Sequence, residues 1–457
     1  MNPFPAILQL RIRPLLVVGE FLLIAALAFR ASQRQMTLVL FLPLGVGLVL
    51  TFLRWPSFGL IVASLAGMVV PYQGFSGLNV TVLLIALLLG LWLLEMIVSR
   101  HQIHLARSQT LWPLMSFLVI AVISFGVGQL PWFTFAVHAP LGAQLGGLAI
   151  VVLSAGTFLL VANRVRDLGW LKMMTWAFLA FGVVAIMMGS VLPKFGLPTQ
   201  RIIQPAGSVY FICLVAMAFS QAALNRDLHP GWRLAIGGLV LYTVYDLFYL
   251  RFVDKSGWLP VLICIAAIIV FRSWRAGLAL IPVAGVAVWY LLTGVASSEE
   301  YSVSTRLDAW SIVAQIIKSN PVLGLGFANY YWYTPLFHIR GYAVNFNSHN
   351  NYVDIVAQTG FVGLVCFLLF LWQVGWLGWR LREQVPAGFA QAYVYGALGG
   401  LVGITVVGMM GDWVVPFFYN IGLSGFRSSM FGWLFLGGLV SLEQMVIKQK
   451  LTAAPQP

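Results

Sequence analysis

Charged residues are scarce in this sequence. Only 9% of its 457 residues are Asp, Glu, Lys or Arg, whereas 60% are hydrophobic. A water-soluble domain carries roughly 25% charged residues to cover its surface, so the composition excludes an ordinary soluble domain. Apolar runs of about 20 residues, the length of a membrane-crossing helix, recur from one end of the chain to the other. We therefore expect a polytopic membrane protein.

Cysteines are also few, and acidic residues are outnumbered by basic ones. The three cysteines, Cys213, Cys264 and Cys366, lie inside apolar runs without CxxC spacing, so we interpret them as packing residues. The net charge of +13 comes from Lys and Arg residues scattered between the apolar runs. This scatter favours contact with a lipid bilayer and argues against a nucleic-acid partner.

The apolar runs predict an all-α fold with about 12 to 14 transmembrane helices. One connection is long. This large loop (295–351) separates an N-terminal helical bundle (1–294) from C-terminal helices (352–457), and all three parts belong to a single membrane domain. The runs 57–71 and 257–271 are short enough to be re-entrant or interfacial. The expected helices are 14–30, 36–53, 57–71, 78–98, 111–128, 141–162, 170–192, 207–225, 232–250, 257–271, 275–294, 352–379, 389–415 and 429–446.

The distribution of basic residues predicts the orientation of these helices. If the N-terminus is cytoplasmic and the helices alternate, most of the 26 Lys and Arg residues fall on the cytoplasmic side. The connections 71–78 and 129–140, which carry no charge, then fall on the other side. We expect both termini to be cytoplasmic and the large loop to be extracytoplasmic.

The large loop contains the pattern of an amphipathic helix. Thr305–Asp308 (TRLD) fits the S/T-x-x-D/E helix start, apolar residues share one face as far as Ile317, and Asn320-Pro321 ends the pattern. We expect the helix to lie on the membrane surface, with Arg306 in its first turn. Free N–H groups and the helix dipole favour a phosphate or pyrophosphate there. The alternative is an ion pair between Arg306 and Glu299, Glu300 or Asp308.

Four motifs follow one another in this part of the chain. They are Arg306, the NPxxGxG turn Asn320–Gly326, the group His349-Asn350-x-Tyr352, and Gly360-x-x-Gly363 at the start of an apolar run. Their order resembles that of the bacterial O-antigen ligase and O-antigen polymerase superfamily. The resemblance is specific over about residues 300–380 and extends to the many-helix topology with one large outer loop. It implies a GT-C-like fold.

The resemblance also implies a function. Such proteins are membrane glycosyltransferases of the bacterial inner (cytoplasmic) membrane that act on its periplasmic or extracellular face during O-antigen or exopolysaccharide assembly. The donor is a glycan on undecaprenyl pyrophosphate, and the acceptor is a lipid A core (ligase) or another lipid-linked glycan (polymerase). Chain-length-regulating membrane proteins are implied as partners, and no metal or cofactor is implied. Arginines stabilise the charge of the leaving pyrophosphate, and a histidine serves the acceptor hydroxyl.

Carried onto this sequence, the resemblance implies that His349 and Arg306 are the catalytic residues. Asn350 and Asn351, which follow the histidine, are predicted to contact substrate. Arg201 lies before an expected helix, where the family often carries a phosphate-binding arginine. The family's following asparagine is missing here, so an arginine that contacts lipid headgroups is an equal alternative.

Three further residues are weaker candidates for substrate binding. Lys255, before Ser256, stands near the position of a third basic site in the family, although lysine cannot bind phosphate as a bidentate fork. His338 and Arg340 lie in the large loop, where solvated side chains are the commoner case.

A transporter or lipid-linked-sugar flippase is the alternative function. Such proteins place polar groups near the bilayer midplane, often in paired repeats. Here the polar residues gather at one face and no repeat is visible. The acids deep in apolar runs, Glu20, Glu95 and Asp246, are few and without evident partners, so the glycosyltransferase is favoured.

Overall fold

Helices account for every regular element in the part of the chain that the structure, a computed structural model, describes. That part comprises residues 45–70, 74, 77–99, 101, 102, 104–197, 199, 207–250, 255–279, 282, 285 and 300–453. Within it, eight helices are long and apolar enough to cross a membrane, and four shorter apolar helices accompany them. The predicted all-α polytopic membrane fold is therefore confirmed. The chain forms two compact units, Met1–Gly59 and Leu60–Pro457, and the second unit contains all the predicted site residues.

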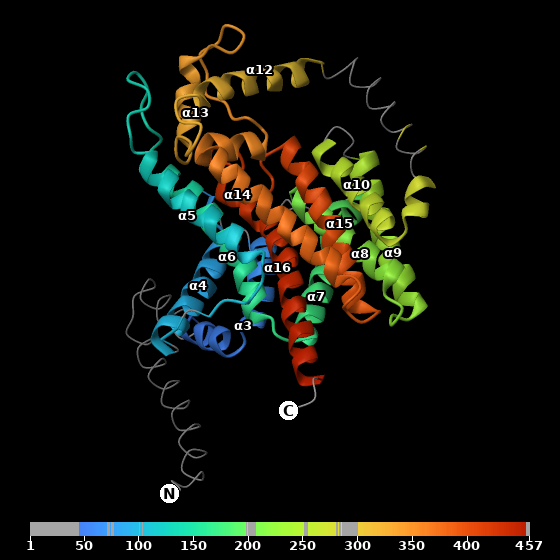
Figure 1. Ribbon diagram of the computed structural model, residues 1–457. Helices are drawn as coiled ribbons and strands as arrows, with labels where there is room; N and C mark the ends of the chain where they lie inside the picture. The colour runs from blue at the N-terminus through green and yellow to red at the C-terminus, as the bar shows by residue number, and fades with distance from the viewer. Residues whose placement is uncertain are drawn as a thin grey trace, which may run out of the picture. The chain divides into compact units, whose positions relative to one another are not determined.

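The helices follow the apolar runs of the sequence (Figure 1). Three of them, α4, α7 and α9, continue into short π or 3-10 turns that end at Ser99, Phe195 and Leu250. The bounds are α3 (Pro56–Val69), α4 (Val80–Leu94), α5 (Leu111–Val127), α6 (Leu141–Arg164), α7 (Leu168–Ile186), α8 (Ser208–Leu224), α9 (Pro230–Tyr245), α10 (Lys255–Arg272), α12 (Glu300–Ile317), α13 (Asn329–Tyr333), α14 (Asn351–Leu381), α15 (Phe389–Met410) and α16 (Gly422–Ala453).

Several predicted boundaries are wrong, and two of the errors affect the site. Helix α15 ends at Met410 and not at residue 415, and α16 begins at Gly422 and not at residue 429. Helix α12 is already formed at Glu300, so Arg306 lies in its second turn and not in the first. The run 14–30, the first part of 36–53 and most of 275–294 lie outside the described residues.

Glycines on α15 bring three helices close together. A Cβ added at Gly403 would lie 2.7 Å from the side chain of Ile212 in α8, and one added at Gly399 would lie 2.3 Å from the side chain of Ile268 in α10. Helices pack closely in a membrane where small residues let their backbones approach. Gly403 also faces the Pro260 carbonyl of α10, so α10 runs antiparallel to α15. The start of α10 therefore lies at the same end of the unit as the end of α15.

The glycine motif of the large loop packs against the glycine motif of α14. Helix α14 is broken at Gly360, where φ is 70° and ψ is −178°. The loop at Pro321–Gly326 fills the break: Phe361 N–H donates to the Pro321 carbonyl at 2.8 Å, and Leu325 N–H donates to the Ala357 carbonyl at 2.9 Å. A Cβ at Gly360 would lie 2.0 Å from the oxygen of residue 322. Only glycine tolerates both this conformation and this contact.

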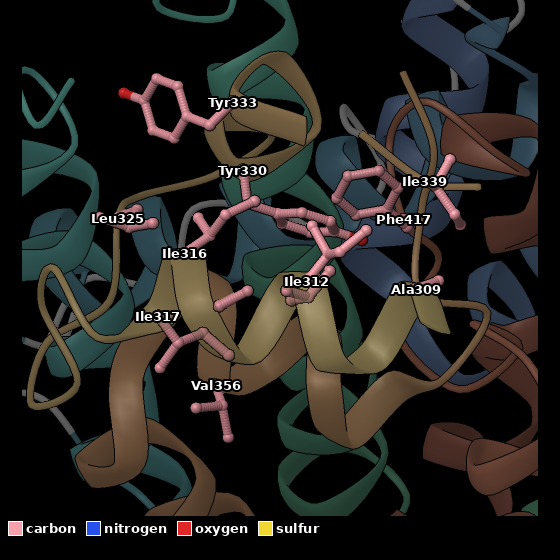
Figure 2. Close-up of a cluster of buried hydrophobic side chains, with 12 residues drawn as sticks. Ala309, Ile312, Ile316, Ile317, Leu325, Tyr330, Tyr333, Ile339, Val356 and Phe417 are labelled. Carbon is pink, nitrogen blue, oxygen red and sulfur yellow. The ribbon is translucent and has the colours of Figure 1, made fainter. Parts of the chain in front are cut away.

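Helix α12 packs its apolar face on protein. Ala309 and Ile316 join a buried cluster with Tyr330, Val356 and Phe417, which come from α13, α14 and the segment after α15 (Figure 2). The prediction of an amphipathic helix is confirmed, but its apolar face is covered by the protein itself. This packing places α12 beside the start of α14 (Figure 1).

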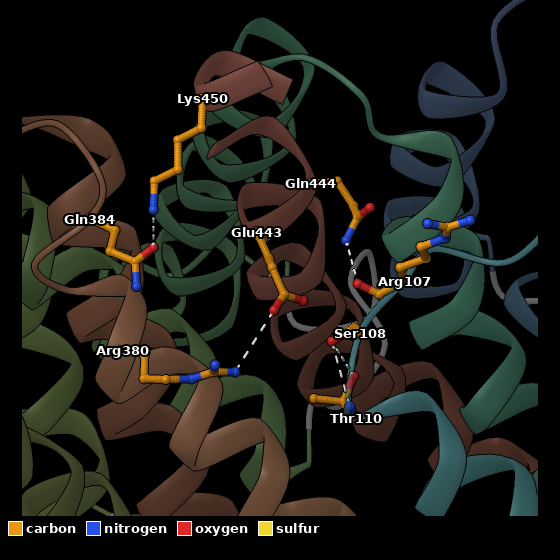
Figure 3. Close-up of polar contacts among 8 residues, drawn as sticks. All are labelled: Arg107, Ser108, Thr110, Arg380, Gln384, Glu443, Gln444 and Lys450. Carbon is orange, nitrogen blue, oxygen red and sulfur yellow. Dashed lines mark hydrogen bonds and ion pairs between the residues drawn. The ribbon is translucent and has the colours of Figure 1, made fainter. Parts of the chain in front are cut away.

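At the opposite end of the second unit, polar contacts join α16 to α14 and to the chain before α5. Arg380 near the end of α14 lies 3.9 Å from Glu443 of α16, and Gln444 Nε2 donates to the Arg107 carbonyl at 3.0 Å (Figure 3). Glu95, which the sequence leaves without an evident partner, forms an ion pair with Arg164 at 2.7 Å. Of the described acids at this end, Glu95, Glu383 and Glu443 each pair with an arginine.

Candidate functional site

His349 lies on a short segment that connects the loop to α14. Its backbone is left-handed, with φ of 50°, and its side chain is exposed. The neighbours hold the segment: Trp310 Nε1 of α12 donates to the Ser348 carbonyl at 2.7 Å, and Asn350 caps α14 by accepting from Tyr352 N–H at 2.9 Å. Asparagine is a favoured N-cap because its side-chain oxygen satisfies a free N–H of the first turn. His349 therefore stands, partly exposed, on a fixed segment.

A turn after α15 carries a buried acid beside this segment. Asp412 is 1% exposed, and its two carboxylate oxygens accept hydrogen bonds from Phe417 N–H at 2.9 Å and from Asn420 Nδ2 at 2.7 Å. Asn351 joins this turn to α14, because its side chain accepts from Val414 N–H at 2.8 Å and donates to the Val415 carbonyl at 2.7 Å. The Asp412 turn and the His349 segment thus form one connected structure.

Arg306 reaches the same place from α12. Its Nη1 donates to the Met410 carbonyl at 3.5 Å, and Asn350 Nδ2 donates to the preceding carbonyl, that of Met409, at 3.3 Å. Of the three predicted alternative partners, Asp308 instead forms an ion pair with Arg340 at 2.8 Å, and the side chains of Glu299 and Glu300 lie outside the described part of the chain. Arg306 is half-buried and approaches the end of α15, where the His349 segment also lies.

Electrostatic effects connect the three side chains. Desolvation by the surrounding protein lowers the pKa of His349 from its ordinary value of 6.5; the carboxylate of Asp412 opposes this shift, and Arg306 adds to it. Burial raises the pKa of Asp412, and hydrogen bonds from Asn420 and Phe417 oppose that shift. A lowered pKa keeps the imidazole neutral at pH 7, which is the form that can accept a proton.

The structure brings together four of the residues predicted from sequence: His349, Arg306, Asn350 and Asn351. The side-chain amides of Asn350 and Asn351 form hydrogen bonds with backbone groups. These hydrogen bonds hold the His349 segment and the Asp412 turn in place. Lys255 begins α10 and lies at the same end of the unit, because α10 and α15 are antiparallel.

Two predicted residues lie away from this cluster, and one lies outside the described residues. Arg340 donates to Asp308 and, at 2.7 Å, to Ser304 Oγ. His338 is exposed beside a turn closed by the Ile339–Tyr342 bridge.

Arg201 is the residue outside the described part of the chain. The first residue described after its segment, Gly207, donates its N–H to Ser428 Oγ at 2.8 Å. A Cβ at Gly207 would lie 3.2 Å from the ring of Trp413. Gly207, six residues after Arg201, therefore lies beside the Asp412 turn.

Sequence analysis missed Asp412 and did not predict that Asp354 and Tyr330 lie beside the His349 segment. Asp412 follows the apolar run of α15 directly, and Gly411 before it and Pro416 after it are signals for a turn. Asp354 and Tyr330 are buried and hydrogen-bonded to each other. The described residues contain no group of three or more His, Cys, Asp or Glu side chains that could hold a metal ion.

The fold and this cluster define a polytopic helical membrane protein with a polar site where its helices end. Residues 231–368 match a family model described as O-antigen ligase (Wzy_C). The match supports the resemblance of this segment to the O-antigen ligase and polymerase superfamily. The matched segment contains Lys255, Arg306 and His349 and ends before Asp412. No curated protein matches the chain.

Proposed function

We propose that the protein is a metal-independent glycosyltransferase that transfers a glycan from undecaprenyl pyrophosphate to a sugar hydroxyl. The observation that carries this proposal is the meeting of Arg306, His349 and Asp412, from three separate segments, at the end of α15. A cation, a neutral imidazole and a carboxylate are the groups that this reaction requires side by side.

The reaction uses each group at a stated step. The acceptor oxygen attacks the anomeric carbon of the donor glycan, and the bond from that carbon to the pyrophosphate oxygen breaks. His349 accepts the hydroxyl proton, and Asp412 stabilises the imidazolium that results. Negative charge grows on the departing undecaprenyl pyrophosphate, and Arg306 stabilises it. The products are the extended glycan, undecaprenyl pyrophosphate and a proton held by His349.

Other basic residues complete the proposed donor site. Lys255 lies at the same end of the unit, and Gly207, six residues after Arg201, lies beside Trp413 of the Asp412 turn. Lys255 and Arg201 would bind the pyrophosphate as additional cations. In this assignment Asn350 and Asn351 support the site, whereas Arg340 stabilises the loop through its pair with Asp308.

We place the site on the periplasmic or extracellular face of the bacterial inner membrane, with both termini in the cytoplasm. The bias of Lys and Arg toward the opposite end supports this orientation. A second lipid-linked glycan is the acceptor of a polymerase and a lipid A core that of a ligase. Membrane proteins that set chain length would be partners in the first case.

The test is transfer by purified protein in detergent or nanodiscs. Undecaprenyl-pyrophosphate oligosaccharide alone should give longer lipid-linked chains if the protein is a polymerase, and a parallel reaction with lipid A core should give a modified core if it is a ligase. Arg306→Ala and His349→Ala should each abolish transfer. Arg226→Ala and His104→Ala, which change exposed residues of the opposite end, are the matched controls. Wild-type transfer by either site variant would remove that residue from the mechanism.

A further inference from the structure

A buried carboxyl group lies against the segment that carries His349. Asp354 of α14 is 1% exposed, and one of its oxygens, Oδ1, accepts hydrogen bonds from the Tyr330 hydroxyl and from Ser348 Oγ, the latter at 2.7 Å. Its other oxygen is buried without a hydrogen-bond partner. Burying a carboxyl group with one oxygen unsatisfied is costly, and an apolar side chain would serve packing better. The acid therefore has a task other than packing.

The hydrogen bonds show what Asp354 holds. Ser348 N–H donates to the Tyr330 hydroxyl at 3.2 Å, and Asn350 N–H donates to Ser348 Oγ at 3.1 Å. The residue before His349 and the residue after it are thus both linked to the pair of Asp354 and Tyr330. His349 itself, between them, has a left-handed backbone conformation, which residues other than glycine rarely adopt.

The direction of a side chain is set by the backbone that carries it. Without the hydrogen bonds at Ser348 and Asn350, His349 would relax from its left-handed conformation and its ring would turn away from the Asp412 turn. Trp310 fixes only the Ser348 carbonyl, so the Ser348 N–H depends on Tyr330. The Asn350 N–H depends on the Ser348 hydroxyl, which is held by Asp354.

We propose that Asp354, together with Tyr330, is a positioning residue that holds the imidazole of His349 toward the acceptor hydroxyl. This role rests on the proposed transfer reaction, in which His349 is the base. Neither Asp354 nor Tyr330 touches the substrate. Both act through the backbone of Ser348 and Asn350.

Three variants test the proposal. Asp354→Leu removes the acceptor oxygens, Tyr330→Phe removes the hydroxyl, and Asp354→Asn keeps one acceptor oxygen in the same place. Thr359→Val is the matched control, because Thr359 is also buried in α14 and loses a single hydrogen bond, to the Ile355 carbonyl at 2.8 Å.

The kinetic readout separates kcat from KM for the lipid-linked donor. We expect Asp354→Leu and Tyr330→Phe to lower kcat by a factor on the order of 100, the effect of misplacing a catalytic group by about 1 Å. KM should change little, because Arg306 and the donor site are intact. Asp354→Asn should restore most of kcat, and Thr359→Val should retain it at equal amounts of folded protein.

The second readout is amide hydrogen exchange, which needs no activity. The Ser348 and Asn350 amides should exchange faster in Asp354→Leu and Tyr330→Phe, while exchange in the rest of α14 is unchanged. If wild-type protein transfers no glycan, the proposed function fails, yet hydrogen exchange still decides whether Asp354 holds the segment.

Two results would overturn the positioning role. One is an unchanged kcat, or unchanged exchange at Ser348 and Asn350, in Asp354→Leu. The other is a loss that extends through α14 or appears equally in Thr359→Val, because that pattern indicates general destabilisation.

Discussion

Asn351→Ala is expected to destabilise the turn that carries Asp412. Asn351 is 1% exposed; it donates to the Val415 carbonyl at 2.7 Å and accepts from Val414 N–H at 2.8 Å and, more weakly, from Val415 N–H at 3.4 Å. Alanine leaves two strongly bonded backbone groups without a partner. At about 1–3 kcal/mol for each such buried group, the free energy of unfolding should fall by about 2–6 kcal/mol. Transfer should fall with it, because Asp412 lies two residues before Val414.

The assay is thermal unfolding of the purified variant in detergent, measured beside its kcat and KM. Asn351→Asp, which keeps the acceptor oxygen but loses the donor, should give an intermediate loss of stability. The reasoning is refuted if Asn351→Ala unfolds like the wild type while KM for donor or acceptor rises. That outcome would make Asn351 a substrate contact, as the sequence suggests.

Two further predictions concern pH and the break in α14. Transfer should rise as pH increases through the pKa of His349, which burial lowers, because only the neutral imidazole accepts a proton. Asp412→Asn removes the carboxylate that raises this pKa, so the acid limb of the pH–rate profile of its remaining activity should move to lower pH; movement to higher pH would contradict the assignment. Gly360→Ala should lower the free energy of unfolding by at least about 1–3 kcal/mol from its left-handed backbone alone. Gly142→Ala, where a Cβ meets nothing within 4 Å, should show no such loss in the same thermal unfolding assay.

The membrane helices could be predicted because their apolar length is a local property of the sequence. The end of α15 and the start of α16 could not be predicted in this way. Val414 and Val415 continue the apolar run of α15 beyond Asp412, and hydropathy does not distinguish a buried turn from a helix. The boundary depends instead on Asn351, whose side chain holds the backbone of residues 414 and 415 in a turn.

Only part of the candidate site could be predicted from the sequence, for the same reason. Arg306 and His349 belong to motifs that can be found along the chain, and their place at one end follows from helix topology. Asp412 carries no motif of its own, and its link to His349 depends on contacts between distant segments. The apolar face of α12 gives a similar lesson, since amphipathicity predicts a helix at a boundary but not whether lipid or protein covers it.

The break at Gly360 divides α14 into two parts with different tasks. The part after the break, residues 361–381, is about 32 Å long at 1.5 Å per residue and can cross the hydrocarbon core by itself. The ten residues up to and including the break, Asn351–Gly360, therefore do not need to cross the bilayer. They can carry polar groups such as Asp354 without burying them in lipid. A single glycine thus separates the first ten residues of α14, which carry polar groups of the candidate site, from the segment that is long enough to cross the bilayer.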